Sequence, residues 1–233
     1  MANQIIKTYG LPIEEIQEKI KDIAKKYESQ VKINVKEKYL DATIDISPIL
    51  DNTLTDAVRE VMQALQENIY AEDYETLYEK LASLLSVRNK KICLFEQGSG
   101  GVITSNLMAI DGASKHIAES IIIPNSDSWI TKFDIDPKLL RENNGVSSKL
   151  VFVIASALRR TCLADYYIVS VSSDAPGLEV YSMGETKDNV ALVAIGDQTG
   201  VEIYKQNLSG DTRDRINQTA KSITYKLIRE LKK

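Results

Sequence analysis

A glycine-rich turn between a strand and a helix is the segment of this sequence best placed to do chemistry. Residues Phe95 to Gly101 read FEQGSGG; they end the apolar run KKICLFE and open a helical one. Backbone N–H groups and the helix dipole can hold an anion at such a junction. The spacing matches neither the P-loop nor the Rossmann motif, and an ordinary tight turn also uses a Gly-Gly pair.

The single histidine and the two cysteines form no recognisable catalytic or metal-binding pattern. His116 has no triad partners at a known spacing, which favours a surface or strand-edge histidine over a general base. Cys93 and Cys162 lie in apolar runs without C-x-x-C spacing, so the sequence predicts neither a metal site nor a disulfide framework. We expect no metal and no cofactor, and buried thiols fit a reducing cytoplasm.

The bulk composition is typical of a soluble globular protein. Of the 233 residues, 43% are hydrophobic and 27% are charged, enough for one large domain or two small ones, and we expect two. The net charge of -4 without a basic stripe argues against nucleic acid as a partner. No signal peptide, transit peptide or membrane-length apolar stretch is present, so we expect no membrane contact and a cytoplasmic location.

The first 70 or so residues predict a small strand–helix–hairpin–helix unit. Its helices and hairpin strands are expected at residues 13–27, 31–35, 42–46 and 51–69. The candidate caps of the second helix are Asn52, Thr53 and Thr55. The hairpin should turn near residues 37–41, and residues 70–77 should join two domains.

The rest of the chain alternates strands and helices, which favours an α/β layer. The predicted helices are residues 76–86, 101–110, 137–143, 147–162 and 212–231. The predicted strands are residues 90–96, 116–123, 166–172, 178–183, 190–196 and 201–208. The fold class is therefore predicted to be α/β (α+β).

Landmarks at matching spacing resemble the C-terminal domain of the CinA family. The family's Glu-Ser-Cys-Thr-Gly-Gly motif falls on residues 96–101, and its Tyr-Ser-Asn-Glu-Ala-Lys segment on residues 124–129. Its Gly-Ala-Val-Ser and Ala-Asp element starts fall on residues 144–147 and on Ala164-Asp165. A serine-and-glycine loop at residues 171–177 and a helix start at residues 210–213, with one inserted residue, extend the resemblance.

The N-terminal part resembles another region of the same family. KTYGLPIEEIQEKI is similar to the start of the KH-like middle domain, and IYAEDYETLYEKLASLL to its junction with the C-terminal domain. The resemblance implies a KH-like domain at residues 1–72 and a CinA C-terminal-type domain at residues 73–233. The family's molybdopterin-binding-type domain is expected to be missing, either in a natural short form or in a cloned fragment. RNA binding is disfavoured because residues 1–75 hold no Gly-x-x-Gly clamp.

The resemblance also implies an activity, the conversion of nicotinamide mononucleotide to nicotinic acid mononucleotide. In the family, the serine of the first motif and the lysine closing the second are the natural nucleophile and base, with the tyrosine as a helper. Here those positions hold Gln97, Trp129 and Pro124. Glutamine lacks a useful nucleophilic oxygen and tryptophan offers only an indole N–H donor, so we expect a degenerate, non-catalytic site.

A rival hypothesis keeps the enzyme active through a relocated pair, with Ser99 as nucleophile and Lys132 as base. Against it, Ser99 suits a structural role in the turn. By resemblance, the positions facing a ligand such as a pyridine mononucleotide are Glu96, Gln97, Ser99, Gly100, Gly101, Asn125, Asp127, Ser172 and Arg213. For Asn125 and Asp127 a helix cap is an equally good interpretation. We expect Trp129 to be buried beside Gly100 and Gly101, and the chain to self-associate as family members do.

Overall fold

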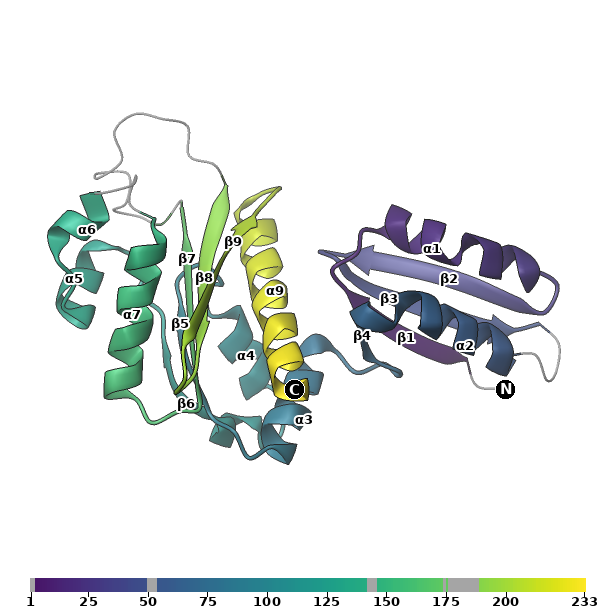
Figure 1. Cartoon of the computed structure of the whole chain (residues 1–233), viewed down its shortest axis with the longest axis horizontal. Coiled ribbons are helices and arrows are strands. Elements are labelled where there is room, and N and C mark those ends of the chain that lie inside the picture. Colours follow the sequence, from purple (N-terminus) through teal and green to yellow (C-terminus); the bar gives the residue numbers. More distant parts are fainter. Residues whose placement is uncertain (1–2, 50–53, 142–145, 174, 176–188) are drawn as a thin grey trace. The chain divides into compact units, whose positions relative to one another are not determined.

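The computed structural model describes residues 3–49, 54–141, 146–173, 175 and 189–233 (Figure 1). The chain divides into two units, Met1–Lys80 and Leu81–Lys233. Each unit combines helices with its own sheet, which confirms the predicted α/β (α+β) fold class. The predicted domain boundary at residues 72 and 73, and the independent folding of residues 76–233, stay predictions.

The first unit packs two helices on one face of an antiparallel sheet. Its elements are β1 (Gln4–Tyr9), α1 (Ile13–Lys26), β2 (Val31–Lys38), β3 (Asp41–Pro48), α2 (Leu54–Leu65), a 3-10 helix (Gln66–Asn68) and β4 (Ile69–Ala71). The four strands are ordered β2-β3-β1-β4. Ala42, Ile44 and Ile46 alternate along β3 and are buried in one cluster with Ile16 of α1 and Val61 of α2. Period-two alternation thus gives β3 one covered face.

The predicted hairpin is confirmed, and its turn is a tight one. Lys38 pairs with Asp41, so Tyr39 and Leu40 alone connect β2 to β3. Their φ angles are 60° and 63°, the left-handed region that two-residue hairpin turns require.

The end of the second predicted helix is wrong by several residues. α2 ends at Leu65, and Ile69 instead begins β4, which pairs with β1. The pairing with a distant strand decides the conformation there, because the apolar pattern suits a helix and a short strand equally. Thr55 lies inside α2 and is not its cap, and Asn52 and Thr53 lie outside the described residues.

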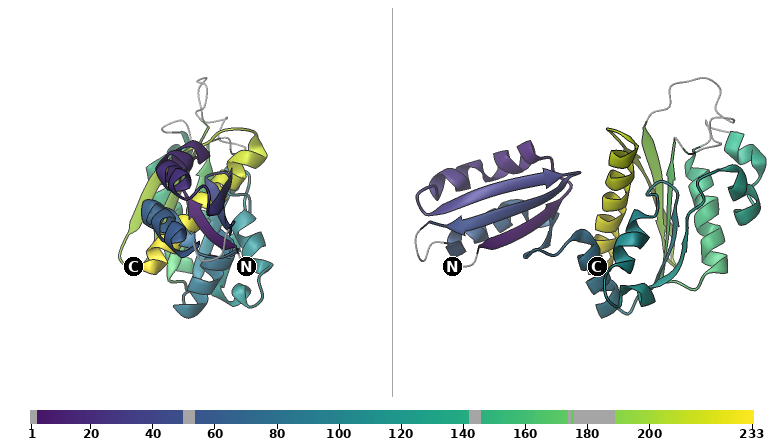
Figure 2. Two further views of the ribbon diagram at one scale, coloured as in Figure 1. Left: turned by 90° about the vertical axis from the view of Figure 1, so that its right-hand side faces the viewer. Right: turned by 180° about the vertical axis from the view of Figure 1, so that it is seen from behind.

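The second unit is a five-stranded mixed sheet with helices on both faces. Helix α3 (Leu77–Val87) leads into β5 (Ile92–Glu96), α4 (Val102–Met108), a 3-10 helix (Ala113–His116), β6 (Ile117–Ile121), α5 (Asp127–Phe133), α6 (Pro137–Arg141), α7 (Ser148–Thr161), β7 (Tyr166–Ser172), β8 (Val190–Gly196), β9 (Val201–Asn207) and α9 (Thr212–Lys232). The strand order is β6-β5-β7-β8-β9. Both views place α7 on one face of this sheet, and α4 and α9 on the other (Figures 1 and 2).

Strand β5 lies between β6 and β7, runs parallel to both, and is buried at every residue. Successive side chains of β5 point to opposite covered faces of the sheet. Those of Cys93 and Phe95 belong to the hydrophobic cluster that α7 covers. Since parallel strands end at the same edge of a sheet, Glu96 and its partner Ser170 bring their following residues together.

Several predicted boundaries of the second unit are confirmed closely. Ser147 caps α7, because its hydroxyl accepts a hydrogen bond from the Leu150 N–H over 3.1 Å. The predicted strand at residues 178–183 lies outside the described residues. No helix in the described part of the chain is long and apolar enough to cross a membrane.

Candidate functional site at the carboxyl end of β5

Glu96, the last residue of β5, closes the start of α4 with its own carboxylate. Its side chain is 1% exposed, and its two oxygens accept hydrogen bonds from the backbone N–H groups of Ile103 (3.0 Å) and Thr104 (2.9 Å). A carboxylate at a helix N-terminus satisfies free N–H donors and complements the dipole. The anion that the sequence allowed at this junction is therefore a side chain of the protein.

Ser99 lies under the turn in a buried chain of hydroxyl and carboxylate groups. Its side chain is 0% exposed, and its hydroxyl lies 2.9 Å from a Glu96 oxygen and 3.1 Å from the Ser170 hydroxyl. Its backbone N–H also donates to the Ser170 Oγ over 3.2 Å. Sequence reasoning did not single out Ser170, although a serine inside the apolar strand YYIVSVS was a visible signal.

Gln97 joins the turn to the end of β7. Its amide oxygen accepts the backbone N–H of Ser172 over 2.7 Å, and the N–H of Gly98 donates to the Ser170 carbonyl over 2.9 Å. A Cβ on Gly98 would lie 3.2 Å from the backbone nitrogens of Val171 and Ser172, so this glycine permits the close approach.

The two glycines that follow turn the chain into α4 between two isoleucines. Gly100 and Gly101 have φ angles of 58° and 80°, which glycine adopts without strain. A Cβ on Gly101 would lie 2.5 Å from Ile122 Cδ1, and one on Gly100 would lie 3.3 Å from Ile216 Cδ1. The turn is thus bordered by apolar side chains from the segment after β6 and from α9.

Trp129 is buried, as expected. It is 0% exposed, and its indole N–H donates to the Ile123 carbonyl over 2.8 Å. Its ring meets the Phe95 ring edge to face, with centroids 5.6 Å apart. Phe95 directly precedes Glu96 on β5, and its side chain projects to the opposite face of the sheet. The Trp129 ring therefore packs on the face opposite the Glu96 side chain. Its expected position beside Gly100 and Gly101, and any narrowing of a ligand site there, stay predictions.

Comparison with known proteins identifies the family of this chain. A family model for the CinA C-terminal domain matches residues 74–232. The chain belongs to the CinA family. A protein of Halothermothrix orenii that bears the name competence-damage inducible protein is 27% identical over 186 residues, 78% of this chain and 44% of that protein. A CinA-like protein of Dictyoglomus turgidum is 25% identical over 228 residues, 92% of this chain and 52% of that protein.

A solved structure shares the CinA fold. The competence or damage-inducible protein of Enterobacter asburiae superposes with a TM-score of 0.58 at 20% identity, over 66% of this chain and 96% of that one. This likeness supports the fold of the CinA-type part. The chain spans about half the length of the curated relatives above, 44% and 52% of them.

The second CinA landmark, residues 124–129, lies at the start of α5, and one of its polar side chains binds the backbone. Asn125 is exposed, and its side-chain oxygen accepts the Asp127 N–H over 3.0 Å, an Asx turn that favours the cap interpretation. Pro124 and Asp127 are exposed. Between them, Ser126 is fully buried, and its hydroxyl has no hydrogen-bond partner among the described residues.

The remaining expected positions are spread around the turn. Lys132 is exposed on α5, and no hydrogen bond in the described chain joins it to Ser99. Arg213 is exposed in the first turn of α9, one helical turn before Ile216, which borders Gly100. Asp211 and Asp214 cap this helix reciprocally, as the resemblance to a helix start implied. The structure therefore brings together the residues of 96–101 with Ser172 and the start of α9.

Proposed function

We propose that this CinA-like chain has a degenerate nicotinamide-nucleotide amidohydrolase site and acts by binding a ligand or by assembly, without catalysis. Serine-based amide hydrolysis needs a hydroxyl, a base that takes its proton, and donors for the oxyanion. Gln97 and Trp129 stand where the family resemblance puts the hydroxyl and the base. Loss of both members of a unit leaves only the residual effect of binding and oxyanion donors.

The observation that carries the proposal is the bond from the Ser172 N–H to the Gln97 amide oxygen. At 2.7 Å it engages the one side-chain oxygen of Gln97, and that oxygen belongs to an amide, which is a poor nucleophile. The side chain at the former nucleophile position thus supports the structure of the strand end. Trp129 adds to the case, since its indole N–H is already satisfied by the Ile123 carbonyl and its ring lies in the core.

One observation favours the alternative, an active amidohydrolase using Ser99 with Lys132. The Ser99 hydroxyl lies 2.9 Å from the Glu96 carboxylate, within reach of a proton acceptor. Two observations oppose it: Ser99 is 0% exposed, so a substrate carbonyl has no access to its hydroxyl in this conformation, and Lys132 is exposed without a bond to it. We therefore keep this alternative second.

The ligand we propose is a pyridine mononucleotide. Ile122 and Ile216 border the turn with apolar surface that can contact a planar ring. Arg213 supplies an exposed guanidinium one turn away, and guanidinium groups bind phosphate in a bidentate way. We further propose a cytoplasmic homo-oligomer that contacts neither membrane nor nucleic acid.

The test is to mix the full chain with nicotinamide mononucleotide and follow binding and product separately. Calorimetry should detect binding, while ammonia and nicotinic acid mononucleotide should stay at background. Arg213→Gln should weaken binding about 10- to 150-fold, the cost of losing a charged hydrogen bond worth roughly 1.5–3 kcal/mol. Arg229→Gln, at the exposed far end of α9, is the matched control and should bind normally.

Two results would contradict parts of this proposal. Product formation that Ser99→Ala abolishes would replace the non-catalytic hypothesis with the relocated pair. Absence of binding at millimolar nucleotide would exclude the pyridine mononucleotide and leave the assembly role, which sedimentation of the same sample measures independently.

A further inference from the structure

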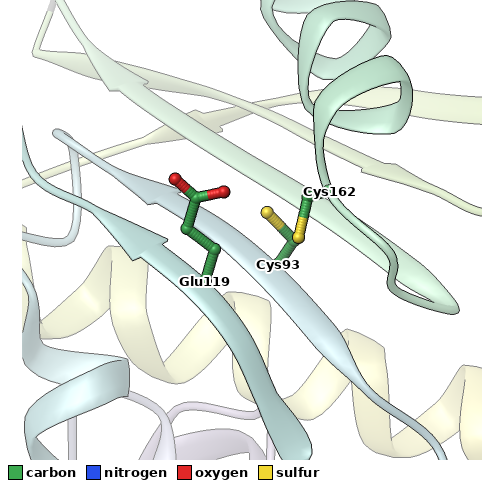
Figure 3. A group of neighbouring side chains, drawn as sticks. All are labelled: Cys93, Glu119 and Cys162. Atoms are coloured by element: carbon green, nitrogen blue, oxygen red, sulfur yellow. The ribbon is translucent and has the colours of Figure 1, made fainter.

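Three side chains from distant parts of the sequence meet away from the turn at residues 96–101. The sulfur atoms of Cys93 and Cys162 and a carboxylate oxygen of Glu119 all lie within 4.8 Å of one another (Figure 3). They come from β5, from the residue that ends α7, and from β6. The spacing along the chain did not predict this cluster, which uses none of the residues discussed for the nucleotide.

The sheet and α7 hold these groups in place. Cys93 and Glu119 are partners across the parallel pair β5 and β6, so their side chains project from the same face. Cys162 is fixed above them at the end of α7, where its N–H donates to the Leu158 carbonyl over 2.9 Å. Its own carbonyl accepts the hydroxyl of Tyr167 over 3.3 Å, and Tyr167 is the partner of Cys93 on β7. Each group is therefore anchored by backbone contacts.

We propose that Cys93, Glu119 and Cys162 form a binding site for a thiophilic divalent cation of the Zn²⁺ class. Two cysteine sulfurs and a carboxylate oxygen are ligands that Zn²⁺ accepts, at about 2.3 Å for sulfur and about 2.0–2.2 Å for oxygen. Tetrahedral geometry with these bond lengths sets the ligand atoms roughly 3.5–3.8 Å apart. Rotations about the side-chain bonds of an already convergent set reach that spacing. Water can occupy the fourth position.

The exposure of the three side chains indicates how an ion enters the site, and the sulfur ligands decide which ions bind. Cys93 is 0% and Cys162 is 8% exposed, while Glu119 is partly exposed on β6, an edge strand of the sheet. An ion therefore enters from the side of Glu119, binds the sulfurs and replaces both thiol protons. Burial, together with the neighbouring thiol of Cys162, raises the pKa of Cys93. Soft sulfur ligands disfavour Mg²⁺ and Ca²⁺.

Cobalt is the probe that reports the ligands directly. The full chain, reduced with a phosphine and stripped of metal by a chelator, is titrated with Co²⁺ and then with Zn²⁺. We expect a sulfur-to-cobalt charge-transfer absorption that saturates at about one ion per chain and disappears as Zn²⁺ displaces Co²⁺. Zn²⁺ should also raise the melting temperature, because it binds the folded chain and ties α7 to the edge of the sheet.

Variants assign the ligands. Cys93→Ala and Cys162→Ala should each remove the charge-transfer absorption or halve it, and Glu119→Gln should weaken Zn²⁺ binding by about tenfold or more, since even outer-shell partners have that effect. Glu202→Gln makes the same change at an exposed position on β9, the opposite edge strand, and should bind as the unaltered chain does.

The proposal is overturned if the reduced chain takes up no stoichiometric Co²⁺ or Zn²⁺, or if the cysteine variants titrate like the unaltered chain. Should a cysteine variant fail to fold, the titration of the unaltered chain against Glu119→Gln still decides. None of these outcomes depends on nucleotide binding, so the metal site and the proposed function fail separately.

Discussion

The side-chain oxygen of Gln97 accepts the backbone N–H of Ser172 over 2.7 Å, just beyond the point where Glu96 pairs with Ser170 across β5 and β7. A side chain therefore extends the hydrogen bonding of two parallel strands by one step. This relationship makes Gln97 a structural residue whose contribution can be measured without any ligand.

Replacing Gln97 by alanine should lower the free energy of unfolding by about 1–2 kcal/mol, because the largely buried Ser172 N–H loses its acceptor. Gln97→Glu keeps an acceptor oxygen in the same place and should cost less. Urea denaturation of the two variants checks this ordering. Equal stability of the alanine variant and the unaltered chain would show that the bond contributes nothing.

Replacing Glu96 should be more costly than replacing Gln97. In Glu96→Ala the N–H groups of Ile103 and Thr104 and the hydroxyl of Ser99 lose their shared acceptor. Each buried donor left unpaired costs about 1–3 kcal/mol, so we expect a loss of about 3 kcal/mol or more. Chemical denaturation measures it, with the exposed Glu202→Ala as control. A loss below that of Gln97→Ala would contradict the capping role.

Trp129 should contribute to stability mainly through its packed ring. Trp129→Ala should cost about 3–5 kcal/mol, the range for truncating a large buried aromatic residue. Trp129→Phe keeps the ring against Phe95 but loses the indole donor to Ile123, and should cost distinctly less. Circular dichroism melts can follow both variants. A mild effect of the alanine change would mean that the Trp129 ring is not part of the packed core.

Lowering the pH should weaken a contact between the starts of β5 and β7. Partial burial would raise the pKa of Asp165, but hydrogen bonds from the Lys90 ammonium and the Lys91 N–H outweigh it, and the pKa is lowered. A group whose pKa is lowered in the folded state stabilises that state at pH values above its ordinary pKa, which is about 3.9 for aspartate. This contribution is lost as the pH falls further.

The stability advantage of the unaltered chain over Asp165→Asn should therefore be constant near pH 6 and shrink below about pH 4. Urea denaturation of the two proteins at pH 6 and at pH 3 measures this difference in stability. The same change at exposed Asp111 is the control for the substitution itself. A constant difference between the unaltered chain and Asp165→Asn down to pH 3 would exclude the linkage.

Strong periodicity explains which elements were predictable. α1, α7 and α9 lie within one residue of their predicted bounds, because long amphipathic patterns carry the helical period and polar residues such as Ser147 and Asp211 mark the starts. β4 was missed because its three residues become a strand only through pairing with β1, a partner some sixty residues away. A local sequence pattern does not show with which distant strand a segment pairs.

The location of the candidate site was predictable from the sequence, but its hydrogen bonds were not. The strand–turn–helix pattern located residues 96–101, and the resemblance to the CinA family predicted the burial of Trp129. The hydrogen bonds of Glu96 with the start of α4, and of Ser99 with Ser170, depend on the direction of side chains at the ends of two strands. The cluster of Cys93, Glu119 and Cys162 was invisible for the same reason, since only the finished sheet aligns β5 with β6 under α7.

The carboxylate that closes α4 has a consequence for selectivity. Because Glu96 is covalently part of the strand that leads into the turn, it competes for the Ile103 and Thr104 N–H groups at an intramolecular concentration that no free metabolite reaches. A phosphate arriving from solution would have to displace the Glu96 side chain from these two N–H groups and leave it buried without them. Dissolved anions therefore compete poorly for this end of the helix, and an anionic ligand needs another partner, such as the exposed guanidinium of Arg213.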